Sequence, residues 1–112
     1  MKARLPDEYR GGSNHMMKQI QQMQEEMARV QQEIEESTFS ASAGGGAVTA
    51  EVSGKNELLS VKLQPEIVDP EDVEMLEDLI LAAVNEALSK ANDAMTQGME
   101  NAKGGLSIPG LL

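Results

Sequence analysis

The chain has 112 residues, enough for one small domain and too few for two ordinary ones. Nineteen Asp and Glu residues against nine Lys and Arg residues give a net charge of −10, while Tyr9 and Phe39 are the only aromatic residues. The absence of cysteine excludes a disulfide scaffold, a cysteine zinc site and thiol catalysis. A core built mainly from aliphatic and methionine side chains is thin for a domain of this size, which indicates a homo-oligomer.

The first residues differ from the rest in charge and composition. Residues 1–18 carry four cations against two acids, a local charge of +2, so the remaining chain carries −12. Pro6, Gly11 and Gly12 are typical of a segment that does not pack, and we predict a flexible arm over 1–14. No apolar run approaches the roughly 20 residues that cross a bilayer, and the first residues lack the apolar segment of a secretion signal. We therefore expect a cytoplasmic protein without a membrane partner.

An apolar stripe with helical spacing follows the arm. From Met16 to Ile34 the apolar residues are separated alternately by four and three residues, which predicts a helix of three heptads with Ser13 or Asn14 as N-cap. A short amphipathic helix is marginal alone, so the stripe must meet another helix. We assign this stripe, with two residues of a predicted strand, to a dimer interface: Met16, Ile20, Met23, Met27, Val30, Ile34, Leu59 and Val61.

The period then falls to two over three short segments, near residues 38–43, 48–53 and 59–64. Apolar residues alternate with polar ones in each segment, and glycine-bearing turns at Gly44–Gly46 and Gly54–Asn56 separate them. This pattern predicts a three-stranded antiparallel meander with one apolar face, ended by Pro65.

A long helix is expected over residues 70–103, with Asp69 as its N-cap, Pro70 at its first position and a candidate break near Gly98. Its length would be about 50 Å, whereas a compact globule of this size has a diameter of roughly 34 Å. The predicted class is therefore α+β: one domain over 15–103, with helices that project from it and a flexible Gly/Pro tail over 104–112. A symmetric homodimer would cover the projecting surface.

We find no combination of residues in the sequence that predicts catalysis or metal binding. His15 is the only histidine, and one histidine does not build a metal site. Gly54-Lys55 fails the phosphate-loop pattern at two positions, where the chain has Thr49 and Asn56. No nucleophile is paired with a base, so we expect a binding protein rather than an enzyme, without cofactor, metal or small-molecule substrate.

Three segments resemble the YbaB/EbfC family of bacterial nucleoid-associated proteins: MMKQIQQMQ at 16–24, EMLEDLILAAVNEA at 74–87 and GGLSIPG at 104–110. The resemblance extends from about Gly11 to the last residue. It implies an α-β-β-β-α subunit in a tweezer-like homodimer that binds double-stranded DNA with little sequence preference, associated with the nucleoid. The family's DNA contacts lie on the projecting first and last helices, where this chain has Lys18, Arg29, Lys90 and Lys103.

A second interpretation remains open from the residues alone. A helix, a hairpin and a second helix with an acidic, methionine-rich surface also suit a helical protein-interaction module or a prefoldin-like holdase that does not bind DNA.

Overall fold

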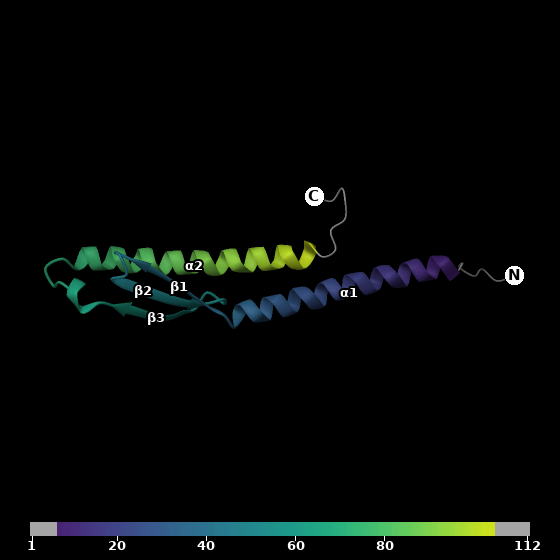
Figure 1. Ribbon diagram of the computed structural model, residues 1–112, viewed down its shortest axis with the longest axis horizontal. Coiled ribbons are helices and arrows are strands. Elements are labelled where there is room, and N and C mark those ends of the chain that lie inside the picture. The colour runs from purple at the N-terminus through teal and green to yellow at the C-terminus, as the bar shows by residue number, and fades with distance from the viewer. Residues whose placement is uncertain (1–6, 105–112) are drawn as a thin grey trace.

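The computed structural model describes the backbone of residues 7–104 and the side chains of residues 14–104. The elements are helix α1 (Asp7–Glu35), strands β1 (Thr38–Ala43), β2 (Val48–Ser53) and β3 (Leu58–Leu63), a short 3-10 helix η1 (Pro65–Ile67) and helix α2 (Val73–Gly104). Figure 1 shows α2 lying along one side of the sheet and then beside the C-terminal half of α1. This order confirms the predicted α+β class.

Helix α1 is longer than the methionine stripe predicts. It begins at Asp7, so residues 7–14 of the predicted arm have helical backbone, and the prediction of Ser13 or Asn14 as N-cap is wrong. Acidic residues in a first turn favour an earlier start, because they interact well with the positive end of the helix dipole, and the sequence has Asp7 and Glu8 there. Residues 1–6 of the arm and the tail beyond Gly104 lie outside the described residues.

The sheet is an antiparallel meander in the order β1-β2-β3. Phe39, Ala41 and Ala43 lie opposite Val52, Ala50 and Val48, so the apolar residues of β1 and β2 share one face, as predicted. The register between β2 and β3 shifts at Glu51 and Val52. This bulge places Leu58 opposite Val52, so Leu59 does not take the position that simple alternation predicts.

The core lies between α2 and the first two strands, and its residues are small. Ala83, Ala87 and Ala91 of α2 are buried against the sheet, and Val48 and Val52 are the largest fully buried side chains among the described residues. Small side chains let the helix approach the strands closely. The core is therefore thin, as the composition indicates.

The start of α2 differs from the prediction by three residues. Asp69 does accept a backbone hydrogen bond, but from Glu71 N–H at 2.9 Å, which closes a local turn before the helix. The carboxylate of Asp72 accepts the N–H of Met75 at 3.3 Å and has the N-cap role. The expectation of Asp69 as N-cap and Pro70 as first helical residue is therefore wrong.

Gly98 does not break α2, which runs without interruption to Gly104. A Cβ atom at Gly98 would lie 2.6 Å from Ile34 Cδ1 and 2.8 Å from Val30 Cγ1. The glycine therefore allows α2 to pack closely against α1, at a helix propensity cost of about 1 kcal/mol relative to alanine.

The molecule is strongly elongated, with extents of 90 × 26 × 17 Å and a radius of gyration of 23.3 Å. A compact chain of this length would have a radius of gyration of about 13 Å. The N-terminal half of α1 projects beyond the end of α2 (Figure 1). We call residues 14–22 of this projecting part the arm tip.

Candidate nucleic-acid interface

The arm tip and the end of α2 each present a lysine. Lys18 lies exposed on the arm tip, and Lys103 lies exposed in the last turn of α2. Because α2 runs back along α1, its last turn points along the long axis in the direction of the arm tip and ends near the middle of the molecule (Figure 1). The acidic residues around η1 and the first turns of α2 lie toward the opposite end. Positive charge is thus separated from the most acidic part of the chain.

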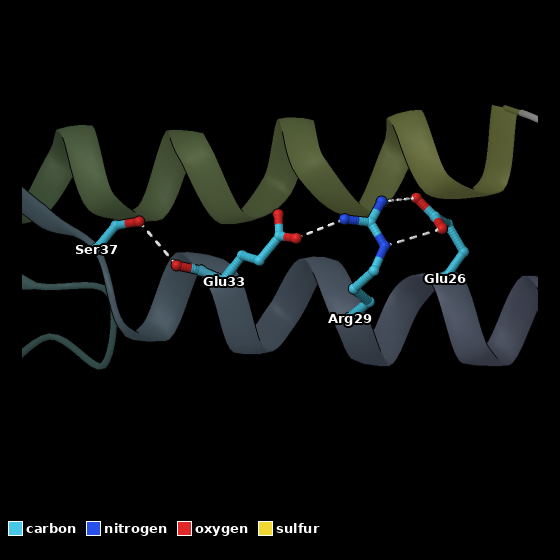
Figure 2. A network of polar contacts seen from close by, with 4 residues as sticks. All are labelled: Glu26, Arg29, Glu33 and Ser37. Atoms are coloured by element: carbon cyan, nitrogen blue, oxygen red, sulfur yellow. Dashed lines mark hydrogen bonds and ion pairs between the residues drawn. The ribbon is translucent and has the colours of Figure 1, made fainter.

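Arg29 is engaged with its own helix. Its Nε donates to Glu26 Oε2 at 3.2 Å, and its guanidinium also forms ion pairs with Glu26 and Glu33 (Figure 2). The Arg29 hydrogen bond holds the pKa of Glu26 below its ordinary value, and the hydrogen bond and charge of Glu26 raise the pKa of Arg29. A phosphate at this position would meet one guanidinium between two carboxylates. Arg29 is therefore a weaker candidate for DNA contact than Lys18.

Lys90 also has a partner within the fold. Its Nζ donates to the backbone oxygen of Ser40 in β1 at 3.0 Å. Gly54 N–H donates to Ser37 O, so Ser37 and Gly54 form a hydrogen-bonded pair of the ladder. Because such pairs alternate along antiparallel strands, Ser40 and Glu51 form a pair without hydrogen bonds. The carbonyl of Ser40 therefore points away from β2, toward the free edge of the sheet. Lys90 thus covers part of the β1 edge, a position at which proteins commonly place lysine to block further strand pairing.

The core face of the sheet is not fully covered at β3. Val61 and Leu63 lie opposite Ala50 and Val48, and Leu58 lies opposite Val52, so all three point to the core face. However, α2 packs mainly on β1 and β2, and Leu58 and Leu63 are 51% and 37% exposed. We call Leu58, Val61 and Leu63 the open core face of β3.

Helix α2 borders this open core face with an apolar flank. Leu79 and Lys90 contact the Gly44 turn and Ser40, which fixes the side of α2 that faces β1. The helical period then turns Val73, Val84 and Leu88 toward the β3 side. Val73 is exposed, and Val84 and Leu88 are half-buried. Sequence patterning missed this surface, because alternation indicates which residues face a core but not whether one helix is wide enough to cover three strands.

The predicted dimer residues fall into two groups in the structure. Met23, Met27, Val30 and Ile34 are half-buried, and Val30 and Ile34 flank Gly98 of the same chain. Met16, Ile20 and Leu59 are exposed, and Val61 belongs to the open core face of β3. Their assignment to a dimer interface stays a prediction.

Two further findings concern the described residues only. No helix within residues 7–104 combines the length and apolar character that crossing a membrane requires. In the same part of the chain, no three His, Asp or Glu side chains come together as a metal site would require.

A solved structure shows the same fold. The uncharacterized protein HP0035 from Helicobacter pylori superposes with a TM-score of 0.57 over 70% of this chain and 90% of its own, at 18% sequence identity. The α-β-β-β-α fold of this chain therefore also occurs in a solved structure.

Sequence comparison identifies the family. The profile of the YbaB/EbfC DNA-binding family matches residues 10–106. A nucleoid-associated protein of Alkaliphilus metalliredigens is 55% identical over 98 residues, covering 88% of this chain and 86% of its own. Another, from Pelotomaculum thermopropionicum, is 54% identical over 101 residues, covering 90% of this chain and 96% of its own. The chain belongs to the YbaB/EbfC DNA-binding family.

Proposed function

We propose that this protein is a homodimeric, nucleoid-associated protein that binds double-stranded DNA through phosphate contacts with little sequence preference. The main support is membership of a DNA-binding family, together with bacterial relatives that are named nucleoid-associated proteins. Lys18 on the arm tip and Lys103 at the end of α2, both away from the acidic end of the molecule, add a physical route to DNA. These lysines meet the phosphate backbone while the acidic end of each subunit stays away from it.

Phosphate contact explains both the binding and its low specificity. Lysine ammonium groups neutralise phosphates and release counterions, a contribution that does not depend on base sequence. The described residues offer few cations on the arm, and Arg29 and Lys90 already have partners within the fold. A dimer doubles the number of free lysines, so binding should depend on dimer formation.

The open core face of β3 supports a second copy as the dimer partner. Leu58, Val61 and Leu63 point to the core side of the sheet, yet Leu58 and Leu63 stay exposed and Val61 is only half-buried. A second copy related by a two-fold axis would place its own open core face of β3 against that of the first copy. Each copy would then cover the apolar residues that its own α2 leaves exposed. This arrangement leaves the arm tips free to contact DNA.

Reversing the charge of Lys18 or Lys103 is expected to weaken DNA binding about tenfold at low salt, because each change removes one phosphate contact per subunit. The slope of log affinity against log salt should fall by about two for a dimer. Lys18→Glu and Lys103→Glu are measured by mobility shift across a salt series on several duplexes of unrelated sequence. The loss should be the same on every duplex.

Lys55→Glu is the matched control for this experiment. Lys55 is an exposed lysine in the β2–β3 turn, at the base of α1, about 26 Å along the helix from Lys18. The control changes the net charge equally and should alter the affinity less than twofold. An equal loss in all three variants, or binding that does not respond to salt, would contradict the proposed contacts.

Leu63→Glu is expected to convert the dimer into a monomer at micromolar concentration, because it places two charges in the proposed interface without a partner. Sedimentation equilibrium should give twice the 12.0 kDa chain mass for the unaltered protein and a single chain mass for the variant. Met17→Glu adds the same charge at an exposed residue of the arm tip and should remain dimeric. A monomeric unaltered protein would refute the dimer, and an unaffected Leu63→Glu would place its interface elsewhere.

A further inference from the structure

The apolar stripe of α1 continues beyond the helix that covers it. Val30 and Ile34 pack at Gly98 of α2, and Met23 and Met27 lie on the same side of α1. The helical period carries this side onward to Ile20 and Met16. These two residues are 48% and 63% exposed, and no described residue covers them.

The end of α2 lies close to the start of this uncovered part. Gly98 lies level with the middle of the Val30–Ile34 turn, and the two helices run in opposite directions. Six further residues bring Gly104 about 9 Å along α1, to the level of Glu26. Met16 then lies only about 15 Å beyond the end of α2.

The arm tip also has an open depression beside the stripe, which shares only Ile20 with it. Met17, Ile20, Gln21 and Gln24 line an open depression of about 270 Å³ on the arm tip. Apolar atoms dominate its lining.

We propose that the chain's own residues 105–112 lie along this stripe and cover Met16, Met17 and Ile20. This segment follows Gly104 directly and contains Leu106, Ile108, Leu111 and Leu112, with no charged residue. Eight residues span at most about 26 Å when extended, enough to reach Met16 from the end of α2. Pro109 opposes continuation of α2 as a helix, so an extended segment takes the place of helix α2 on the stripe.

The tail is a better occupant of this surface than a second copy. A segment tethered a few residues away has an effective concentration in the millimolar range, far above that of a separate chain. A second arm tip would also bring another Lys18 close to the first. This inference does not depend on DNA binding and goes beyond the proposed function.

The absence of cysteine allows a direct test of the tail position in the full chain. A nitroxide is attached at Ser107→Cys, and the methionine ε-methyl signals are recorded by NMR. We expect broadening of the Met16 and Met17 signals and none of the Met75 signal, because Met75 lies near the opposite end of α2. Unbroadened Met16 and Met17 signals would overturn the proposal.

A mixing experiment separates the chain's own tail from a partner's tail. Chains with isotope-labelled methionine but no nitroxide are mixed with nitroxide-bearing chains that lack the isotope. The Met16 and Met17 signals should stay sharp. Broadening in this mixture would show that the tail crosses to another copy and would overturn the proposal.

A charged substitution in the stripe of α1 tests independently whether the tail docks there. Ile20→Glu in the spin-labelled chain should cause loss of most of the broadening at Met16 and Met17. Gln22→Glu introduces the same charge at an exposed residue on the other side of α1 and should preserve it. Far-ultraviolet circular dichroism confirms that both variants keep their helices. Equal broadening in the two variants would contradict docking on the stripe.

Discussion

Gly54→Ala is expected to cause the largest loss of stability among single substitutions in this protein. Gly54 is buried where the β2–β3 turn passes the end of α1. A Cβ atom there would lie 1.8 Å from the backbone oxygen of Ile34 and 2.9 Å from Glu35 Cα. Because the obstacle is backbone rather than a flexible side chain, α1 must move away from the sheet. We expect a cost of about 3 kcal/mol or more, a large share of the roughly 5–15 kcal/mol by which a typical domain is stable.

Urea denaturation followed by circular dichroism measures this loss, and Gly104→Ala is the matched control. Gly104 lies at the end of α2, and a Cβ atom added there would meet no heavy atom of the described residues within 4 Å. The control should change the free energy of unfolding by less than about 0.5 kcal/mol. Similar midpoints for the two variants would show that the close approach of Gly54 to Ile34 is not tight in solution.

Ala87→Leu is expected to be the second most damaging change. Ala87 is fully buried between α2 and the sheet, where the largest fully buried side chains are two valines. A leucine at this position has no space and must push the helix away from β1 and β2, at a cost of about 3 kcal/mol. Ala82→Leu adds the same side chain at an exposed position of α2, and leucine is nearly as good a helix former as alanine.

Thermal unfolding monitored by circular dichroism compares the two alanine variants. Ala87→Leu should lower the midpoint by more than about 10 °C, whereas Ala82→Leu should leave it nearly unchanged. Equal midpoints would mean that the core accommodates a larger residue, contrary to the close packing of α2 on the strands.

Patterns with a regular period predicted most of the fold. Alternation placed the three strands, and the long apolar period placed α2, because each reports a repeated burial of the same face. The ends of the helices were less predictable. Asp69 and Asp72 offer the same capping chemistry three residues apart, and the local turn at Asp69 decides in favour of Asp72.

The role of Gly98 shows a different limit of sequence reasoning. A glycine near a helix end indicates a break when only helix propensity is considered. In the structure the same residue makes room for Val30 and Ile34. That requirement comes from a helix more than sixty residues earlier in the chain, so local sequence does not contain it.

The sequence indicates the candidate cations, but it does not show which of them already have a partner within the fold. Glu26, Arg29 and Glu33 are spaced three and four residues apart, a pattern that does favour ion pairs on one helix face. The contact between Lys90 and Ser40 joins residues fifty positions apart and requires the folded sheet. Lys18 and Lys103 therefore remain the stronger predictions for contact with DNA.

If the proposed dimer forms, the two sides of the sheet bear on how many copies it can include. On the β1 edge, Lys90 occupies the outward carbonyl of Ser40, whereas the β3 side keeps an apolar face without cover among the described residues. Two copies that associate through β3 each use the same surface, so neither offers it to a third. Growth into an open-ended fibre would require the β1 edge as well. In the proposed dimer, the covered β1 edge and the open core face of β3 would thus favour closure at two subunits.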